Sequence, residues 1–156
     1  MEQAAIERFL SSLEEQHQLY LAMIDIDRQQ AELLSNEHFD SPDALLELVH
    51  QKQHLMGLVS SIEQTLQPLR DEWHRWRSQL PESMTAPVES ALGSMAETIR
   101  ILIELEDESQ QRLSTLRGSA QQDLETIRRK SQINKAYSAY GSQRQGPKFI
   151  DQRTEG

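Results

Sequence analysis

Apolar residues recur at alternating steps of three and four throughout residues 45–80. This spacing keeps side chains on one side of a helix, and a seam of about five heptads requires partner helices of similar length. Only Lys52 interrupts the apolar character of the seam. The pattern therefore predicts a bundle of long helices. The seam positions are Leu45, Leu48, Lys52, Leu55, Val59, Ile62, Leu66, Leu69, Trp73, Trp76 and Leu80.

A first helix is predicted over residues 3–34, where an apolar stripe precedes a break in the pattern. His17 lies on this stripe, and a hydrogen-bonded structural role is favoured over pH sensing or metal binding. Ser41, Pro42 and Asp43 have the residue types of an N-cap, a first-turn proline and a dipole-matching acid. They predict a second helix over residues 42–80. The first stripe comprises Ile6, Phe9, Leu10, Leu13, Tyr20, Ile24, Ala31 and Leu34.

Pro68 lies inside the second predicted helix, on the side away from the seam. A proline ring removes one backbone hydrogen bond and clashes with the carbonyl four residues earlier. Because the seam keeps its phase here, the pattern predicts a bend near residues 64–69 instead of a break into two helices. Trp73 and Trp76 continue the seam, so they are predicted to fill the core, with a binding platform as the alternative.

Residues 81–87 contain two prolines and predict a turn, with Thr85 as the cap of a third helix over residues 86–131. Glu106 and Ser109 form a polar gap in the apolar stripe of this helix. The gap is typical of a wetter or thinner layer, or of a helix rotated so that neighbouring apolar residues share the contact. The stripe otherwise comprises Val88, Leu92, Met95, Ile99, Leu102, Leu113, Leu116, Ala120, Leu124 and Ile127.

Two short connections between three long helices predict an all-α protein, an elongated antiparallel three-helix bundle with coiled-coil-like packing and a C-terminal tail. The helical bundle is predicted over residues 1–131. The basic tail is predicted over residues 132–156, partly helical to about residue 140. Six glycines and five prolines in 156 residues provide little of the punctuation that a sheet of short strands needs.

Charge is distributed unevenly along the chain. Residues 1–127 contain 23 acidic and nine basic residues (net −14), whereas residues 128–156 contain two and seven (net +5), which gives −9 for the whole chain. The acidic body disfavours nucleic acid as a partner, because phosphate binding needs a basic face on the folded part. The basic tail suits an acidic surface, and the body of the same chain is one such surface.

The absence of cysteine excludes disulfides and thiolate metal sites. The first residues carry an acid where a signal peptide has a basic stretch, and no apolar run precedes a cleavage site. No run approaches the roughly 20 apolar residues that span a bilayer. We therefore expect a cytoplasmic protein without an integral membrane segment.

His50 and His54 are the main candidates for metal chemistry, because they lie four residues apart with Glu47 preceding them. This spacing can bind zinc or join a di-iron site. However, the seam places both histidines on the polar side, and the glutamate that zinc proteases carry between their two histidines is missing here. No phosphate loop, nucleophile elbow or catalytic triad pattern is present. The sequence therefore predicts no enzyme, no cofactor and no metal site.

Apolar residues within the basic tail are the candidate partner-binding residues. Flexible basic segments with spaced apolar anchors often bind helical partners. A tail that folds back on its own acidic bundle is the alternative, and the two are compatible if a partner displaces the tail. The candidates are Ile133, Tyr137, Tyr140, Phe149 and Ile150.

The chain resembles the FlgN-type flagellar export chaperones, a family of small, cytoplasmic, all-helical proteins. The resemblance rests on long helices joined by short turns, on the Leu- and Gln-rich segment ALLELVHQKQHLMGLV, and on the closing segment INKAYSAYGSQRQGPKFIDQR. In the closing segment, a tyrosine–glycine pair is followed by Phe-Ile-Asp.

This resemblance implies a chaperone of flagellar type III export that binds hook-filament junction (hook-associated) subunits and prevents their premature assembly. Components of the export apparatus are further expected partners, and the C-terminal region is expected to contact the client. No catalytic residue is carried over. The regular seam over residues 45–80 equally suits a structural or adaptor coiled-coil protein that acts by protein binding or by self-association as a homo-oligomer.

Overall fold

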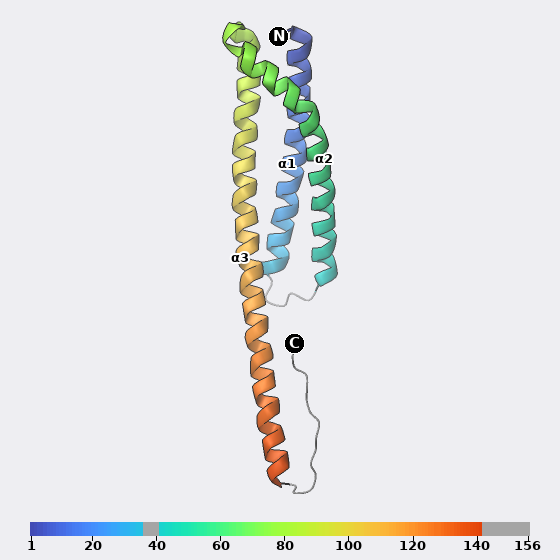
Figure 1. Cartoon of the computed structure of the whole chain (residues 1–156), viewed down its shortest axis with the longest axis vertical. Helices are drawn as coiled ribbons and strands as arrows, with labels where there is room; N and C mark the ends of the chain where they lie inside the picture. Colours follow the sequence, from blue (N-terminus) through green and yellow to red (C-terminus); the bar gives the residue numbers. More distant parts are fainter. Residues whose placement is uncertain (36–40, 142–156) are drawn as a thin grey trace. The chain divides into compact units, whose positions relative to one another are not determined.

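A computed structural model describes residues 1–35 and 41–141, and the side chains of Asn134 and residues 137–141 lie outside that description. The elements are α1 (Gln3–Ser35), α2 (Pro42–Trp76), a 3₁₀ helix η1 (Arg77–Gln79) and α3 (Glu82–Gly141), as Figure 1 shows. No strand occurs within the described ranges, which confirms the predicted all-α class. None of the helices described here is apolar enough over a sufficient length to cross a membrane.

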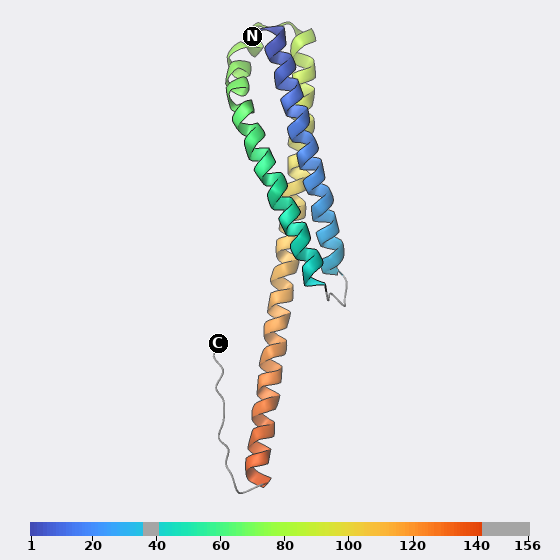
Figure 2. The same cartoon turned by 90° about the vertical axis from the view of Figure 1, so that its right-hand side faces the viewer.

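Two compact units divide the chain, Met1–Arg112 and Leu113–Gly156. In the first unit, α1, α2 and the beginning of α3 lie side by side, and helices that follow each other along the chain are antiparallel (Figures 1 and 2). α1 and α2 approach each other most closely. The first unit is therefore an antiparallel three-helix bundle, as the sequence predicts.

The predicted seam of α2 faces the interior of the first unit. Each seam position except Trp76 is buried or half-buried. Trp73 is only 1% exposed, which confirms it as a core residue, whereas Trp76 is 37% exposed. The core role predicted for Trp76 is wrong, because α2 ends at this residue and the backbone continues as η1.

Phe9 of α1, Trp73 of α2 and Val88 of α3 are buried together in one apolar cluster of the core. The ring centroids of Phe9 and Trp73 lie 6.0 Å apart with an interplanar angle of 53°. This tilted arrangement suits the quadrupoles of the two rings. A second apolar cluster contains Met23 and Leu102, so the core continues along the bundle.

Pro68 bends α2 without dividing it. The helix continues from Pro42 to Trp76, and its ribbon curves visibly in its second, green half (Figure 1). Pro68 is exposed while Leu66 and Leu69 remain buried or half-buried. The lost backbone hydrogen bond therefore lies away from the core, where water can solvate the free carbonyl.

The interior seam of α1 is more polar than the stripe predicted from its apolar residues. Gln16, Asp27 and Gln30 are buried, whereas the predicted stripe members Leu10 and Ala31 are only half-buried. The three polar residues join six others at strict steps of three and four, the spacing of a coiled-coil seam. The seam comprises Ile6, Phe9, Leu13, Gln16, Tyr20, Met23, Asp27, Gln30 and Leu34.

α3 begins inside the segment for which the sequence predicts a turn. The backbone N–H of Thr85 donates to the carbonyl of Pro81 at 3.1 Å, which forms the first helical turn. The hydroxyl of Thr85 donates to the carbonyl of Glu82 at 3.4 Å instead of capping a later helix. The predicted turn over residues 81–87 and the Thr85 cap are therefore wrong. Pro87 is accommodated within the helix, near its N-terminal end.

At its other end, α3 continues without interruption to Gly141. The helical part predicted for the tail, to about residue 140, is thus a continuation of α3. The first compact unit ends at Arg112, earlier than the predicted bundle boundary at residue 131. The physical reason is length, because α1 and α2 have 33 and 35 residues and cannot cover a helix of 60 residues.

Candidate partner-binding surface

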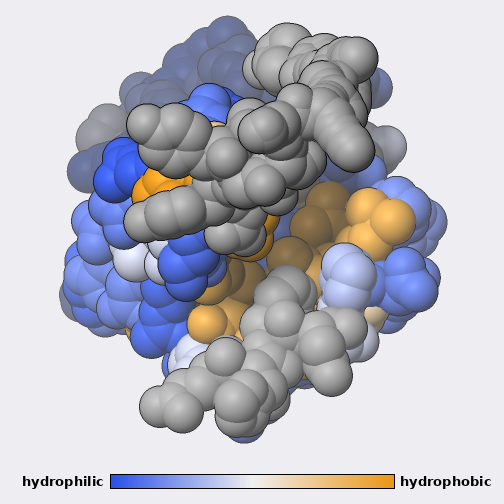
Figure 3. Space-filling view, turned by 90° about the horizontal axis from the view of Figure 1, so that it is seen from below, coloured by the Kyte–Doolittle hydropathy of each residue, from blue (hydrophilic) through white to orange (hydrophobic). Residues whose placement is uncertain are grey.

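An apolar stripe is exposed on α3 within the second unit. Its large side chains have exposed fractions of 44% at Leu113, 39% at Leu116, 59% at Leu124 and 63% at Ile127. Single exposed apolar residues are common, but a row of them at helical spacing forms a continuous face. Figure 3 shows the molecule from below, where hydrophobic residues lie beside hydrophilic ones on this face. We define the α3 stripe as Leu113, Leu116, Ala120, Leu124 and Ile127.

Charged residues border the α3 stripe and change sign along it. Arg117 is exposed in its first half, Asp123 and Glu125 are exposed on either side of Leu124, and Arg128, Arg129 and Lys130 are exposed at its end. From residue 126 to the end of α3 the sequence contains no acidic residue. An apolar face with such borders is suited to an amphipathic helix with acidic residues on its flank.

The tail residues predicted to bind a partner do not belong to the α3 stripe as described. Ile133 is on α3 and 51% exposed. It follows Ile127 by six residues, which places it about 240° further round the helix. Tyr137 and Tyr140 belong to the helical backbone of α3, but their side chains lie outside the description.

Phe149 and Ile150, the two remaining candidates of the tail, lie outside the described residues. Partner binding by the five tail residues therefore stays a prediction. The α3 stripe itself contains residues that the sequence places in the bundle interior, and their exposure corrects that placement. Apolar spacing identifies the face of the helix but does not tell whether another helix covers it.

A layer of three charged residues lies within the first unit, one from each helix. The Nζ of Lys52 on α2 donates to Oδ1 of Asp27 on α1 at 2.7 Å and contacts Oε1 of Glu106 on α3 at 2.6 Å. The side chains of Asp27, Lys52 and Glu106 are 0%, 17% and 42% exposed. All three occupy seam positions of their helices. The polar interruptions of the second and third helices therefore meet, and the gap at Glu106 is a polar layer of the bundle.

Burial and neighbouring charges contribute differently to the pKa values of Asp27 and Lys52 in this layer. Burial raises the pKa of Asp27 above its ordinary value, although the hydrogen bond and charge of Lys52 oppose the shift. Burial alone lowers the pKa of Lys52, but hydrogen bonds and charges from Asp27 and Glu106 outweigh it and raise the pKa. Two carboxylates face one ammonium, so the cation is held firmly. Oδ2 of Asp27 is buried without a hydrogen-bond partner.

The unfolding free energy is expected to rise, relative to an Asp27→Asn variant, as the pH falls from 7 toward 4. Because folding raises the pKa of Asp27, the native state binds this proton more tightly, and stability is lost as the pH increases through the folded pKa. Urea denaturation of both proteins at several pH values measures the difference. A difference that stays constant from pH 7 to 4 contradicts the raised pKa.

Other polar contacts join α1 to α2 and α3 and fix which face of α1 lies against each of them. The side chain of Gln16 donates to Oε2 of Glu63 on α2 at 2.9 Å, and Glu63 also pairs with Arg70. These hydrogen bonds, with Gln16 contributing most, keep the pKa of Glu63 below its ordinary value. His17 Nε2 lies 2.7 Å from the hydroxyl of buried Thr98 on α3, which supports the hydrogen-bonded structural role predicted for His17.

Arg112, the last residue of the first unit, also binds α1. Its Nη1 donates to the backbone carbonyl of Ala31 at 2.9 Å. Together with Lys52 and Glu106, this contact attaches α3 to α1 and α2 close to the point where the compact unit ends. Apolar patterns do not identify buried Gln16, Asp27 and Gln30 on α1 or Thr98 on α3. For the three residues of α1, the strict spacing along the seam is the signal that identifies them.

His50 and His54 are exposed on α2, as their position outside the seam predicts. With Ile26 and Glu47 they line an open surface hollow of about 430 Å³. Among the residues that the structure describes, no group of three or more His, Cys, Asp or Glu side chains is arranged to hold a metal ion.

The fold and its surfaces define an all-helical protein with a three-helix bundle and an exposed apolar face on its third helix. No protein-family model, no curated protein and no solved structure matches the chain. Its function is therefore inferred from its own residues, and above all from the α3 stripe.

Proposed function

We propose that this protein is a FlgN-like, cytoplasmic chaperone of flagellar type III export. In this proposal it binds hook-filament junction subunits, prevents their premature assembly and transfers them to components of the export apparatus. The observation that carries the proposal is the exposed α3 stripe, since water-exposed apolar faces of this kind mark binding sites for other proteins. The resemblance of the closing sequence to FlgN-type chaperones supplies the class of client.

The proposed mechanism is addition of a client helix to the α3 stripe. Leu124 and Ile127 are more than half exposed, so a docked amphipathic helix removes further apolar area from water. Acidic residues on the client's flank pair with Arg128, Arg129 and Lys130, and fix the direction of binding. An assembly-prone subunit helix that is held in this way is unavailable for polymerisation until it is released.

The double substitution Leu124→Gln/Ile127→Gln is expected to weaken binding of purified hook-filament junction subunits at least about tenfold, which corresponds to about 1.4 kcal/mol. Glutamine preserves helix propensity and removes the apolar contact. Isothermal titration calorimetry with the full chain measures the affinity. Ile103→Gln is the matched control, because Ile103 is 54% exposed on the same helix but lies in the first unit.

Unchanged affinity of the double variant would contradict the role of the α3 stripe. A chain truncated after Lys130 tests the tail separately, because it retains the stripe and lacks Ile133 and the residues that follow it. Undiminished binding by the truncated chain removes the tail from the mechanism and leaves the stripe. If no junction subunit binds the full chain at micromolar concentration, the chaperone proposal fails.

A second candidate function is a structural or adaptor coiled-coil protein that acts by self-association. The same stripe favours it, because exposed heptad-like apolar residues also pair with identical helices. Light scattering over a range of protein concentrations separates the two functions. A chaperone keeps its mass and binds a client in fixed stoichiometry, whereas a self-associating protein gains mass with concentration and loses that gain when Leu124 and Ile127 are replaced.

A further inference from the structure

α3 contains two apolar seam segments in the same helical phase. The first, residues 88–102, contributes Val88, Met95 and Leu102 to the core of the first unit. The second is the α3 stripe, whose side chains are exposed. Only Glu106 and Ser109 separate the two segments along the seam. Burial of apolar surface is non-directional, so by itself it does not favour one of the two segments over the other in the groove between α1 and α2.

The charged layer supplies the preference that apolar burial lacks. When residues 88–102 lie on α1 and α2, Glu106 reaches Lys52 at 2.6 Å, and Lys52 reaches Asp27 at 2.7 Å. The α3 stripe offers only leucine, alanine and isoleucine at its seam positions. If this stripe, on a second copy of the chain, entered the groove, Lys52 would lose one of its two carboxylates and would face apolar side chains.

Lys52 would then keep Asp27 as its single counter-charge, and losing the contact with Glu106 in a largely buried layer is unfavourable. Oδ2 of Asp27 is already buried without a hydrogen-bond partner, so a further loss of pairing adds to the polar groups that this layer leaves unsatisfied. The hydrogen bond between Thr98 and His17 is a further contact of the native segment, and Arg112, which follows that segment, donates to the carbonyl of Ala31. The free-energy cost therefore arises only when the α3 stripe of a second copy occupies the groove.

We propose that the layer of Asp27, Lys52 and Glu106 makes the groove between α1 and α2 selective for residues 88–106 of its own chain. It excludes the α3 stripe of a second copy, and so prevents exchange of helices between molecules. The stripe consequently stays available for another partner. This inference does not depend on the identity of that partner, because it concerns only the chain and its copies.

The triple variant Asp27→Leu/Lys52→Leu/Glu106→Leu tests the proposal. Replacing a buried charged layer with apolar residues often increases stability, so the melting temperature is expected to rise. The groove then accepts either segment, and the oligomeric fraction at a given concentration is expected to increase at least about threefold over the wild-type chain. Light scattering after size-exclusion chromatography measures the mass, and circular dichroism measures the helicity.

A second pair of variants identifies the surface responsible for the added mass. Adding Leu113→Gln/Leu116→Gln to the triple variant is expected to return the mass to the wild-type value. The rearranged layer Asp27→Lys/Lys52→Glu/Glu106→Lys keeps opposite charges in contact and is expected to retain the wild-type mass. Gln16→Leu controls for removal of a buried polar group in a different layer and is expected to leave the mass unchanged.

Glu106→Leu alone decides the question if the triple variant does not fold, because this side chain is 42% exposed and its replacement disturbs the core little. The single variant is expected to show a smaller increase in oligomer that also disappears with Leu113→Gln/Leu116→Gln. Wild-type mass in a folded triple variant, or in Glu106→Leu, overturns the proposal. So does an oligomer that persists after the stripe is made polar.

Discussion

Replacing Trp73 with alanine is expected to lower the free energy of unfolding by about 3–5 kcal/mol, the range for removing a large aromatic side chain from a core. Trp73 is almost completely buried and packs against Phe9, so the substitution leaves a cavity where all three helices meet. Urea denaturation followed by circular dichroism measures the change. The loss amounts to a large part of the stability of an ordinary domain.

Trp76→Ala is the matched control for this result. It removes the same side chain three residues later, where 37% of the residue is exposed, and is expected to destabilise the protein by about 1 kcal/mol or less. Trp73→Phe is expected to lie between the two, because it leaves a smaller cavity and removes an indole N–H that has no hydrogen-bond partner. Equal losses for the two alanine variants would contradict the observed core.

Replacing Lys52 with methionine is expected to destabilise the protein by about 3–5 kcal/mol at pH 7, because it leaves Asp27 buried without its counter-charge. The loss is expected to shrink as the pH is lowered, since Asp27 can then be protonated and its charge removed. Thermal or urea denaturation at pH 7 and pH 5 measures both effects. A loss that grows on acidification is the outcome that rules out this explanation.

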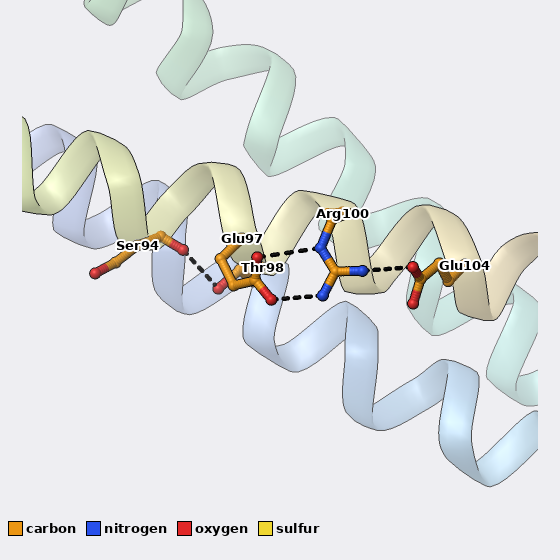
Figure 4. A network of polar contacts seen from close by, with 5 residues as sticks. All are labelled: Ser94, Glu97, Thr98, Arg100 and Glu104. Carbon is orange, nitrogen blue, oxygen red and sulfur yellow. Dashed lines mark hydrogen bonds and ion pairs between the residues drawn. The ribbon is translucent and has the colours of Figure 1, made fainter.

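Arg100→Ala is the control for the Lys52 substitution. Arg100 also contacts two carboxylates, Glu97 and Glu104, but all three side chains are exposed on α3 (Figure 4). Exposed ion pairs contribute little because water and salt screen them. We expect Arg100→Ala to leave the unfolding free energy almost unchanged, although Lys52 and Arg100 have the same number of acidic partners.

The seam of α2 could be predicted from the sequence because burial there follows apolar character almost without exception. Lys52 and the gap at Glu106 were also visible in the sequence as polar interruptions. The pairing of Lys52 with Glu106 could not be predicted, because spacing along one helix contains no information on which residue of another helix lies opposite. Asp27 was missed for a related reason, since a buried charge is stabilised by its partner and not by its own hydropathy.

The end of the three-helix bundle could not be predicted either. The apolar pattern of α3 continues past Arg112 with the same spacing, so it gives no sign that covering helices have ended. The start of α3 was obscured by Pro81 and Pro87, which locally favour a turn. The carbonyl of Pro81 nevertheless accepts the first helical hydrogen bonds, and the tertiary structure overrides the local preference.

The bend at Pro68 has a consequence for the order in which α2 opens. Because proline has no amide hydrogen, the carbonyl of Gln64 receives no helical bond, and cooperativity between successive turns is weakened there. On the C-terminal side of the bend, Trp73 packs against Phe9 of α1. On the N-terminal side, Lys52 pairs with Asp27 of α1 and Glu106 of α3. We therefore expect amide exchange with solvent to be faster in the turn that lacks this hydrogen bond than in the turns of Trp73 and Lys52.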